Sequence, residues 1–244
     1  MKGIDICAQN FLETLDVNLL RFLKRANLLR RFVREILISE SIKHINISHE
    51  IEQKLISNFY KDKRIENINQ RKKFLSYHGL NESDLHYQIL VSLKIKKVCL
   101  EKFKDDVDSH FLKRKEELDQ FVYSIIRVDN ADLAHEIYLR IEAKEEEFSS
   151  LANKYSKEKN VYKNGLMGPS SIVRCHPLLK ESITSSIPGD LIKPFKLENS
   201  WIILRVEEKK PAKLDLKMEE KMMFELFEIY IQKMINKILR NLIK

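Results

Sequence analysis

The sequence predicts an α+β fold, in which an all-helical domain built from both ends of the chain carries an inserted module of helices and strands. In residues 1–118, apolar side chains recur at three- and four-residue steps, the spacing of amphipathic helices. All five prolines and three of the five glycines lie between residues 165 and 211, so turns concentrate there. Residues 212–244 read as one more helix. We therefore expect three segments, 1–118, 119–211 and 212–244.

The first two helices are predicted from one apolar face each. The first ends near His44, and its inward residues are Leu29, Phe32, Val33, Ile36 and Leu37. The second begins after Ser48, whose hydroxyl can accept a hydrogen bond from an unpaired amide of the first turn. Its inward residues are Ile51, Leu55, Ile56 and Phe59.

Local end signals define the next helices. A third runs from about Asn67 to His78 and ends at Gly79, the residue type best able to adopt the left-handed conformation after a helix. Either Asn81 or Ser83 can cap a long fourth helix, whose inward residues are Leu85, Ile89, Leu93 and Leu100. A short fifth helix is indicated by Val107, Phe111 and Leu112.

The middle segment mixes strands and helices. Residues 121–128, FVYSIIRV, are β-branched and aromatic, as strands are, and Asn130 can cap the helix that follows. A second short helix carries Phe148, a third follows Pro177, and residues 200–206, SWIILRV, form a final strand. The order β-α-α-β-α-β-β describes a compact α+β module of about 90 residues.

The C-terminal helix is apolar over too much of its circumference to be stable alone. Its two apolar stripes are Met223, Leu226, Tyr230, Met234, Ile238 and Leu242, and Phe224, Phe227, Ile231 and Ile235. Because no other core lies nearby in sequence, we expect this helix to return and pack among the helices of the first half. The middle segment is then an insertion.

Composition argues against several site types. Cys7, Cys99 and Cys175 are odd in number and far apart, which disfavours a disulfide framework, and we expect the first two to be small buried hydrophobes. His44 and His49 straddle a predicted helix break, so they lack the one-face geometry of a helical metal-ligand pair. We expect no metal and no cofactor.

The start of the chain, MKGIDICAQNFLETLD, has acids where a signal peptide has its apolar core, and no stretch approaches the roughly 18 apolar residues of a membrane span. We therefore expect a cytoplasmic protein with no membrane span. The net charge of +8 invites a nucleic-acid role. The basic residues of RANLLRRFVR, 25–34, alternate with core positions, however, and no nucleic-acid-binding motif accompanies them, so a solvated helix face is the better interpretation.

The middle segment resembles the parvulin family of peptidyl-prolyl isomerases over about residues 121–208. The resemblance is carried, in the family's order, by YSIIRV, FSSLANKYS, GLMGP, HPLLKESITSSIPGDLIKPF and SWIILRVEEK. A helical domain built from both chain ends around such an insertion further resembles SurA-like and PrsA-like foldases. The resemblance implies unfolded or extended, proline-containing polypeptide clients.

The resemblance also implies where proline binds. Isomerising an X-Pro bond needs no nucleophile, metal or cofactor, and a pocket that holds the ring and strips water from the amide supplies most of the mechanism. The family's pocket walls fall on Met167, Cys175 and Leu179, which are apolar enough to hold proline. His176 is not at a family histidine position, and its place next to Pro177 favours a helix-start or surface role.

The family's polar catalytic positions are substituted here. Its two histidines fall on Ser124 and Trp201, for which filling a former active site as core is the simpler interpretation, although an indole could also stack on a bound proline. The family's Cys or Asp position falls on Glu158, which can equally be an ordinary solvated loop acid between Lys157 and Lys159.

Two functions follow as expectations. The first is a parvulin-like isomerase and foldase that binds client chains and has a degenerate active site. The alternative is a non-catalytic chaperone, or a peptide-maturation or secretion partner, that binds proline-containing segments. Loss of both histidines leaves enzyme activity uncertain, and the sequence does not define the oligomeric state.

Overall fold

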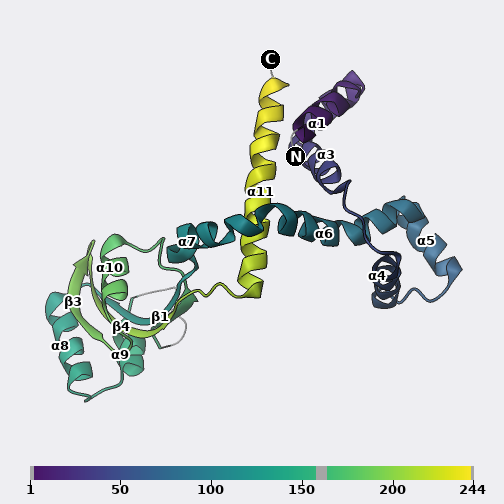
Figure 1. Ribbon diagram of the computed structural model, residues 1–244. Helices are drawn as coiled ribbons and strands as arrows, with labels where there is room; N and C mark the ends of the chain where they lie inside the picture. The colour runs from purple at the N-terminus through teal and green to yellow at the C-terminus, as the bar shows by residue number, and fades with distance from the viewer. Residues whose placement is uncertain (1–2, 158–163, 243–244) are drawn as a thin grey trace. The chain divides into compact units, whose positions relative to one another are not determined.

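The structure is a computed structural model that describes residues 3–157 and 164–242 (Figure 1). The chain divides into two compact units. Unit 1 combines Met1–His110 with Asp215–Lys244, and unit 2 is Phe111–Leu214. The boundaries predicted from the sequence lie after residues 118 and 211, because the whole helix that ends at residue 118 was assigned to the first segment.

Unit 1 is helical throughout its described residues. Its elements are α1 (Ile4–Glu13), α2 (Val17–Arg25), α3 (Leu29–Ile42), α4 (His49–Asp62), α5 (Ile68–His78), α6 (Glu82–Phe103), the short 3-10 helix η1 (Lys104–Asp106) and α11 (Leu216–Asn241). Helix α7 (Val107–Leu118) contains the division between the units. The sequence analysis gave no bounds for α1 and α2.

Helix α11 packs against α3 and α6, although more than a hundred residues separate it from each of them in the chain. The side chains of Phe227, Ile231 and Ile235 are fully buried along it. At the edge of this contact, the Arg34 guanidinium of α3 lies 2.5 Å from the Glu228 carboxylate. The two ends of the chain therefore share one core.

The helix ends of unit 1 follow the local signals closely, with one exception. Asn67 and Asn81 both form capping boxes, with Gln70 and Asp84 respectively. Gly79 ends α5 in the left-handed conformation, as predicted. Ser48 precedes α4, but its hydroxyl makes no cap hydrogen bond among the described residues. The first turn of α4 carries Glu50 and Glu52 instead, whose charges suit the unpaired amides.

Three residues expected on inward faces are exposed. Ile51 of α4 and Leu100 of α6 are each 43% exposed, and Leu112 of α7 is 68% exposed. A stripe drawn at four-residue steps drifts around a helix of 3.6 residues per turn. The end of α6 therefore buries Val98 and Cys99 instead.

Unit 2 is a four-stranded antiparallel sheet with helices on both faces (Figure 1). Its elements are β1 (Gln120–Val128), α8 (Ala131–Glu142), α9 (Phe148–Tyr155), β2 (Leu166–Ser170), α10 (Pro177–Ser185), β3 (Leu191–Leu197) and β4 (Ser200–Lys210). The strand order is β2-β1-β4-β3. The predicted fold class and the predicted order of elements are confirmed.

The two faces of this sheet carry separate apolar clusters. We call the first the α10 face, because Leu179 and Ile183 of α10 pack there on Ile125, Ile202 and other strand residues. We call the second the α8–α9 face, where helix residues such as Phe148 cover Ile126, Val128 and Ile203. Because neighbouring residues of β1 and β4 alternate between these faces, both strands are apolar on each side.

The described residues include no helix that is long and apolar enough to span a membrane.

Candidate functional site

Three residues predicted to hold proline lie together on the α10 face. Leu179 of α10 is buried in that cluster, and the half-buried Met167 of β2 and Cys175 pack against it. Their chain positions span a strand, a loop and a helix. The structure therefore packs Met167, Cys175 and Leu179 in one apolar cluster, and we call this part of the α10 face the slot.

Two glycines of the GLMGP segment let β2 approach β1 closely enough to place Met167. A Cβ atom on Gly168 would lie 2.2 Å from the carbonyl oxygen of Phe121, and one on Gly165 would lie 2.8 Å from Cβ of Ala152. Both glycines also have positive φ angles, 98° and 81°. Only glycine fits these two positions without moving the backbone.

Tyr123 is a slot residue that the sequence analysis missed. It lies opposite Met167 in the β1–β2 pairing, its ring is buried on the α10 face, and its hydroxyl oxygen is 4.0 Å from Cys175 Sγ. Either atom of that pair can donate the hydrogen bond. Strand alternation could have found Tyr123, since it is two residues from Ile125 on the same face.

Phe195 adds an aromatic wall to the same face. It packs against the α10-face cluster and pairs with Ile202 across the β3–β4 ladder. Its neighbour Pro194 interrupts the regular register between Ile192 and Phe195. Phe195 and Tyr123 therefore belong to the same apolar cluster as the slot residues.

Ser124 lies on the other side of the sheet. It is buried, and its hydroxyl donates a hydrogen bond of 2.5 Å to Oε1 of Glu207. Glu207 also accepts a hydrogen bond of 2.8 Å from Nε of Arg205, whose guanidinium lies 5.1 Å from the Phe148 ring centre on the α8–α9 face. The β1–β4 pairing skips Glu207, which is the extra residue of a bulge. The bulge thereby supplies Ser124 with an acceptor.

Trp201 also belongs to the α8–α9 face. It is half-buried against that cluster and pairs with Val128, whereas Ser124 pairs with Arg205. Ser124 and Trp201 are therefore neither cross-strand partners nor on the slot's side of the sheet. Glu158, the third polar position, lies outside the described residues.

The remaining candidates have structural places. Nδ1 of His176 accepts a hydrogen bond of 3.3 Å from the amide of Leu178, so His176 caps α10. Cys99 is buried, and burial raises the pKa of its thiol to about 12, whereas Cys7, expected to be buried, is exposed. Cys7 lies on the outer side of α1, which buries mainly Ala8 and Leu12.

No group of three or more His, Cys, Asp or Glu side chains within the described parts of the chain could hold a metal ion.

Comparison with known proteins identifies the sheet domain. Residues 125–208 match the Rotamase family model, described as the PPIC-type PPIASE domain. The resemblance of the middle segment to parvulins is thus confirmed, and this part of the chain is a PPIC-type domain. No curated protein matches the chain.

Solved structures match over most of the chain. Peptidylprolyl isomerase PrsA from Bacillus anthracis is 20% identical, with 86% of this chain and 96% of that chain covered and a TM-score of 0.39. PrsA from Bacillus cereus is 19% identical, with 91% and 85% covered and a TM-score of 0.46. A chain from the work on the SurA-like chaperones PEB4 and Cj1289 of Campylobacter jejuni is 17% identical, with 99% and 91% covered and a TM-score of 0.37.

Proposed function

We propose that this chain, which carries a PPIC-type domain over residues 125–208, is a foldase that binds unfolded or extended polypeptides and seats their prolines in the slot. The observation that carries the proposal is the convergence of Met167, Cys175 and Leu179 on the α10 face of that domain. Isomerisation at this site is weak, because the polar side chains expected of a parvulin are substituted.

The slot suits a pyrrolidine ring for a physical reason. The barrier to rotation about a peptide bond is roughly 18 to 20 kcal/mol, because amide resonance separates charge in the planar state. An apolar wall formed by Met167, Leu179 and Phe195 strips water from that charge and so favours the twisted state. The slot can therefore lower the barrier by its shape and dryness alone.

One polar pair remains at the slot. The Tyr123 hydroxyl and the Cys175 thiol can each donate a hydrogen bond, and the acceptor could be the carbonyl or the nitrogen of a bound X-Pro amide. Both of the described histidines of unit 2 are elsewhere, since His135 lies on α8 and His176 caps α10. This polar set is smaller than the histidine network implied by the parvulin resemblance, which supports weak catalysis.

Unit 1 offers an apolar surface suited to client chains. The described residues of α1, α2 and the turn after them expose several large apolar side chains: Ile6, Phe11, Val17, Leu19, Phe22 and Leu28. A group of exposed apolar residues of this size is typical of a binding surface. Binding of unfolded polypeptides by this surface is part of the proposal.

A second candidate function is a chaperone that holds proline-containing segments without isomerising them. The observation that favours it is the placement of Ser124 and Trp201 on the α8–α9 face, away from the slot.

The cytoplasmic location expected from the sequence stays a prediction, which cell fractionation tests.

The two functions separate in an exchange experiment on a short peptide containing one Leu-Pro bond, followed by NMR. A foldase of the proposed kind broadens or exchanges the cis and trans signals weakly at catalytic amounts, whereas a holding chaperone shifts the signals without raising exchange. Met167→Asp places a charge in the slot and should abolish both effects.

Leu178→Asp is the matched control, because Leu178 neighbours Leu179 on α10 but is 47% exposed. This variant should leave the peptide signals as in the wild type. If the NMR signals of the peptide do not change when the full-length protein is added, proline binding is refuted.

A further inference from the structure

A second hollow, far from the slot in sequence, lies in unit 1 between α4 and α5. Its volume is about 500 Å³, within the range of ligand-binding pockets. Three cations line it, Lys61, Arg64 and Arg71, against a single carboxylate, Glu66. The lining therefore carries a clear excess of positive charge.

The cations of this hollow form no salt bridge within the described residues, where no carboxylate oxygen lies within 4.0 Å of the charged atoms of Lys61, Arg64 or Arg71. The guanidinium of Arg71 lies 4.2 Å from the centre of the Tyr60 ring, and its Nε is buried without a hydrogen-bond partner. A partly desolvated guanidinium binds an anion more strongly than a fully hydrated one.

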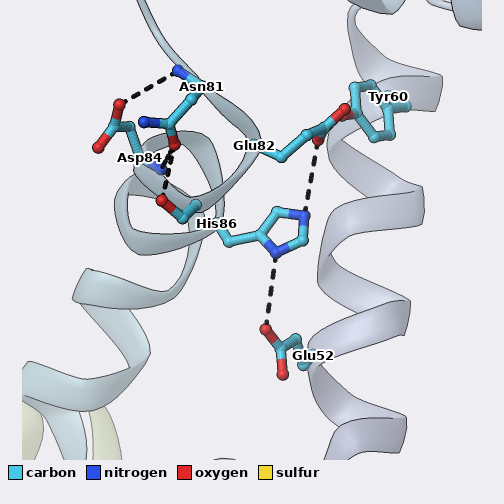
Figure 2. A network of polar contacts seen from close by, with 7 residues as sticks. Glu52, Tyr60, Asn81, Glu82, Asp84 and His86 are labelled. Carbon is cyan, nitrogen blue, oxygen red and sulfur yellow. Dashed lines mark hydrogen bonds and ion pairs between the residues drawn. The ribbon is translucent and has the colours of Figure 1, made fainter.

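Tyr60, the aromatic residue that lines the hollow, is fixed by a hydrogen bond from its hydroxyl. The Tyr60 hydroxyl donates a hydrogen bond of 3.1 Å to Glu82, and burial, with Glu82 as a second cause, raises the pKa of Tyr60 (Figure 2). His86 lies between Glu82 and Glu52, at 3.8 Å and 3.9 Å (Figure 2). Glu82 accepts the hydrogen bond of Tyr60 and is not among the residues that line the hollow.

The backbone at Arg64 is unusual for its residue type. At the end of helix α4, the amide of Ile65 donates a hydrogen bond to the carbonyl oxygen of Tyr60. The amide of Arg64 donates one to the carbonyl oxygen of Lys61. In this type of helix end, the residue at the position of Arg64 adopts a left-handed conformation and is usually glycine. Arg64 has a φ of 55° there, so the chain keeps a cation where glycine would be less strained.

The floor of the hollow is apolar. Ile56, Tyr60 and Ile65 line it, and all three belong to the apolar cluster that joins α4, α5 and the start of α6. A ligand that fits this lining has an anionic group for the cations and an apolar group beside it.

We propose that this hollow binds a carboxylate of an extended polypeptide, from an acidic side chain or the chain terminus, next to an apolar residue. The carboxylate pairs with Arg64 and Arg71, and the apolar side chain rests on Ile56 and Ile65. The apolar floor gives the side chain of a polypeptide a contact that a phosphodiester backbone lacks. The site lies in unit 1 and does not depend on proline binding or isomerisation.

The test is fluorescence polarisation with the full chain and three labelled peptides that share an apolar sequence. One has an internal Glu and a blocked end, one has Gln in its place and a blocked end, and one has Gln and a free terminal carboxylate. The blocked Gln peptide should bind about tenfold more weakly than the better of the two carboxylate peptides. The two carboxylate peptides identify the source of the anion.

Variants of the hollow sharpen the test. Arg64→Gly relieves the backbone strain at the end of α4, so the unfolding temperature should stay unchanged or rise. The same variant should bind the carboxylate peptide about fivefold or more weakly than wild type does, and Arg71→Gln should weaken the binding of this peptide to a similar extent. Lys72→Gln is the matched control, because Lys72 is the exposed neighbour of Arg71 and does not line the hollow.

Equal binding of all three peptides would overturn the proposal, and so would equal weakening by Lys72→Gln and Arg71→Gln, which would show attraction to net charge alone. A short single-stranded RNA that displaces the peptide from the wild type but not from Arg64→Gly would assign the hollow to phosphates instead.

Discussion

The hydroxyl of Ser124 donates a 2.5 Å hydrogen bond to Glu207 on the α8–α9 face of the sheet, the face opposite Cys175 and the slot. The residue at which the resemblance places a parvulin histidine therefore has a structural contact. The residue that faces the slot from the same strand is its neighbour Tyr123. The effect of histidine substitutions at Ser124 and Trp201 depends on which face of the sheet these residues occupy.

Putting the histidines back at the aligned positions should not create an isomerase. In the double variant Ser124→His, Trp201→His, both imidazoles would enter the α8–α9 face, where the first also displaces the hydrogen bond to Glu207. We expect no acceleration of a proline-limited refolding reaction over wild type, and a loss of stability of about 1 to 3 kcal/mol from overpacking. A stable double variant with clearly faster catalysis would show that the active site lies on the α8–α9 face and not at the slot.

Gly168 should be far less replaceable than another glycine with the same backbone angle. A Cβ at Gly168 meets the Phe121 carbonyl oxygen at 2.2 Å, whereas nothing lies within 4 Å of a Cβ at Gly189, and both have a φ of 98°. Gly189→Ala should cost about 1 to 2 kcal/mol for the backbone alone, and Gly168→Ala clearly more. Urea unfolding of the two variants compares the costs, and equal losses would contradict the close approach of β2 to β1.

Phe227→Ala should weaken unit 1 and leave unit 2 intact. Phe227 is fully buried on α11, so the truncation should cost about 3 to 5 kcal/mol, while Ile229→Ala, 44% exposed on the same helix, should cost little. Trp201 is the only tryptophan of the chain and lies in unit 2. Its fluorescence transition should stay in place while the helical signal in circular dichroism melts earlier, and a matching shift of both signals would mean that the units unfold together.

The three cysteines should react with a maleimide in a fixed order. Cys7 is exposed, Cys175 is half-buried in the slot, and Cys99 is buried with a thiol pKa raised to about 12. We expect Cys7 to react first and Cys99 at least about a hundredfold more slowly, with a proline peptide protecting Cys175. Mass spectrometry of the labelled peptides gives the rates.

The same thiol gives a pH dependence of stability. Folding raises the pKa of Cys99 above its ordinary value of 9.0, so the unfolded chain ionises first as the pH rises. The contribution of Cys99 is complete below pH 9 and is lost between pH 9 and 12. Cys99→Ala should flatten this part of the stability curve, and an unchanged slope would show that the thiol does not cause it.

Sequence reasoning succeeded where the signals were local. Helix α5 was predicted at both ends, because Asn67 and Gly79 act through neighbouring backbone groups. Helices α1 and α2 were missed. The described part of α1 buries only Ala8 and Leu12, and α2 buries only Leu23.

The site was predictable only in part. Met167 and Leu179 were proposed because they lie in sequence blocks that resemble the parvulin pattern, and Cys175 directly precedes one of these blocks. The faces of Ser124 and Trp201 were not found, because β1 and β4 are apolar on both sides and their pattern does not show which helix covers which side. The bulge at Glu207 depends on pairing between distant strands, which no local signal encodes.

Both termini contribute to unit 1, and this has a consequence for protein synthesis on the ribosome. The stretch Phe111–Leu214 emerges before α11, so the PPIC-type domain can finish folding while the first helices still lack their last partner. Until translation delivers α11, the faces of α3 and α6 that will contact it stay open to other nascent chains and to chaperones.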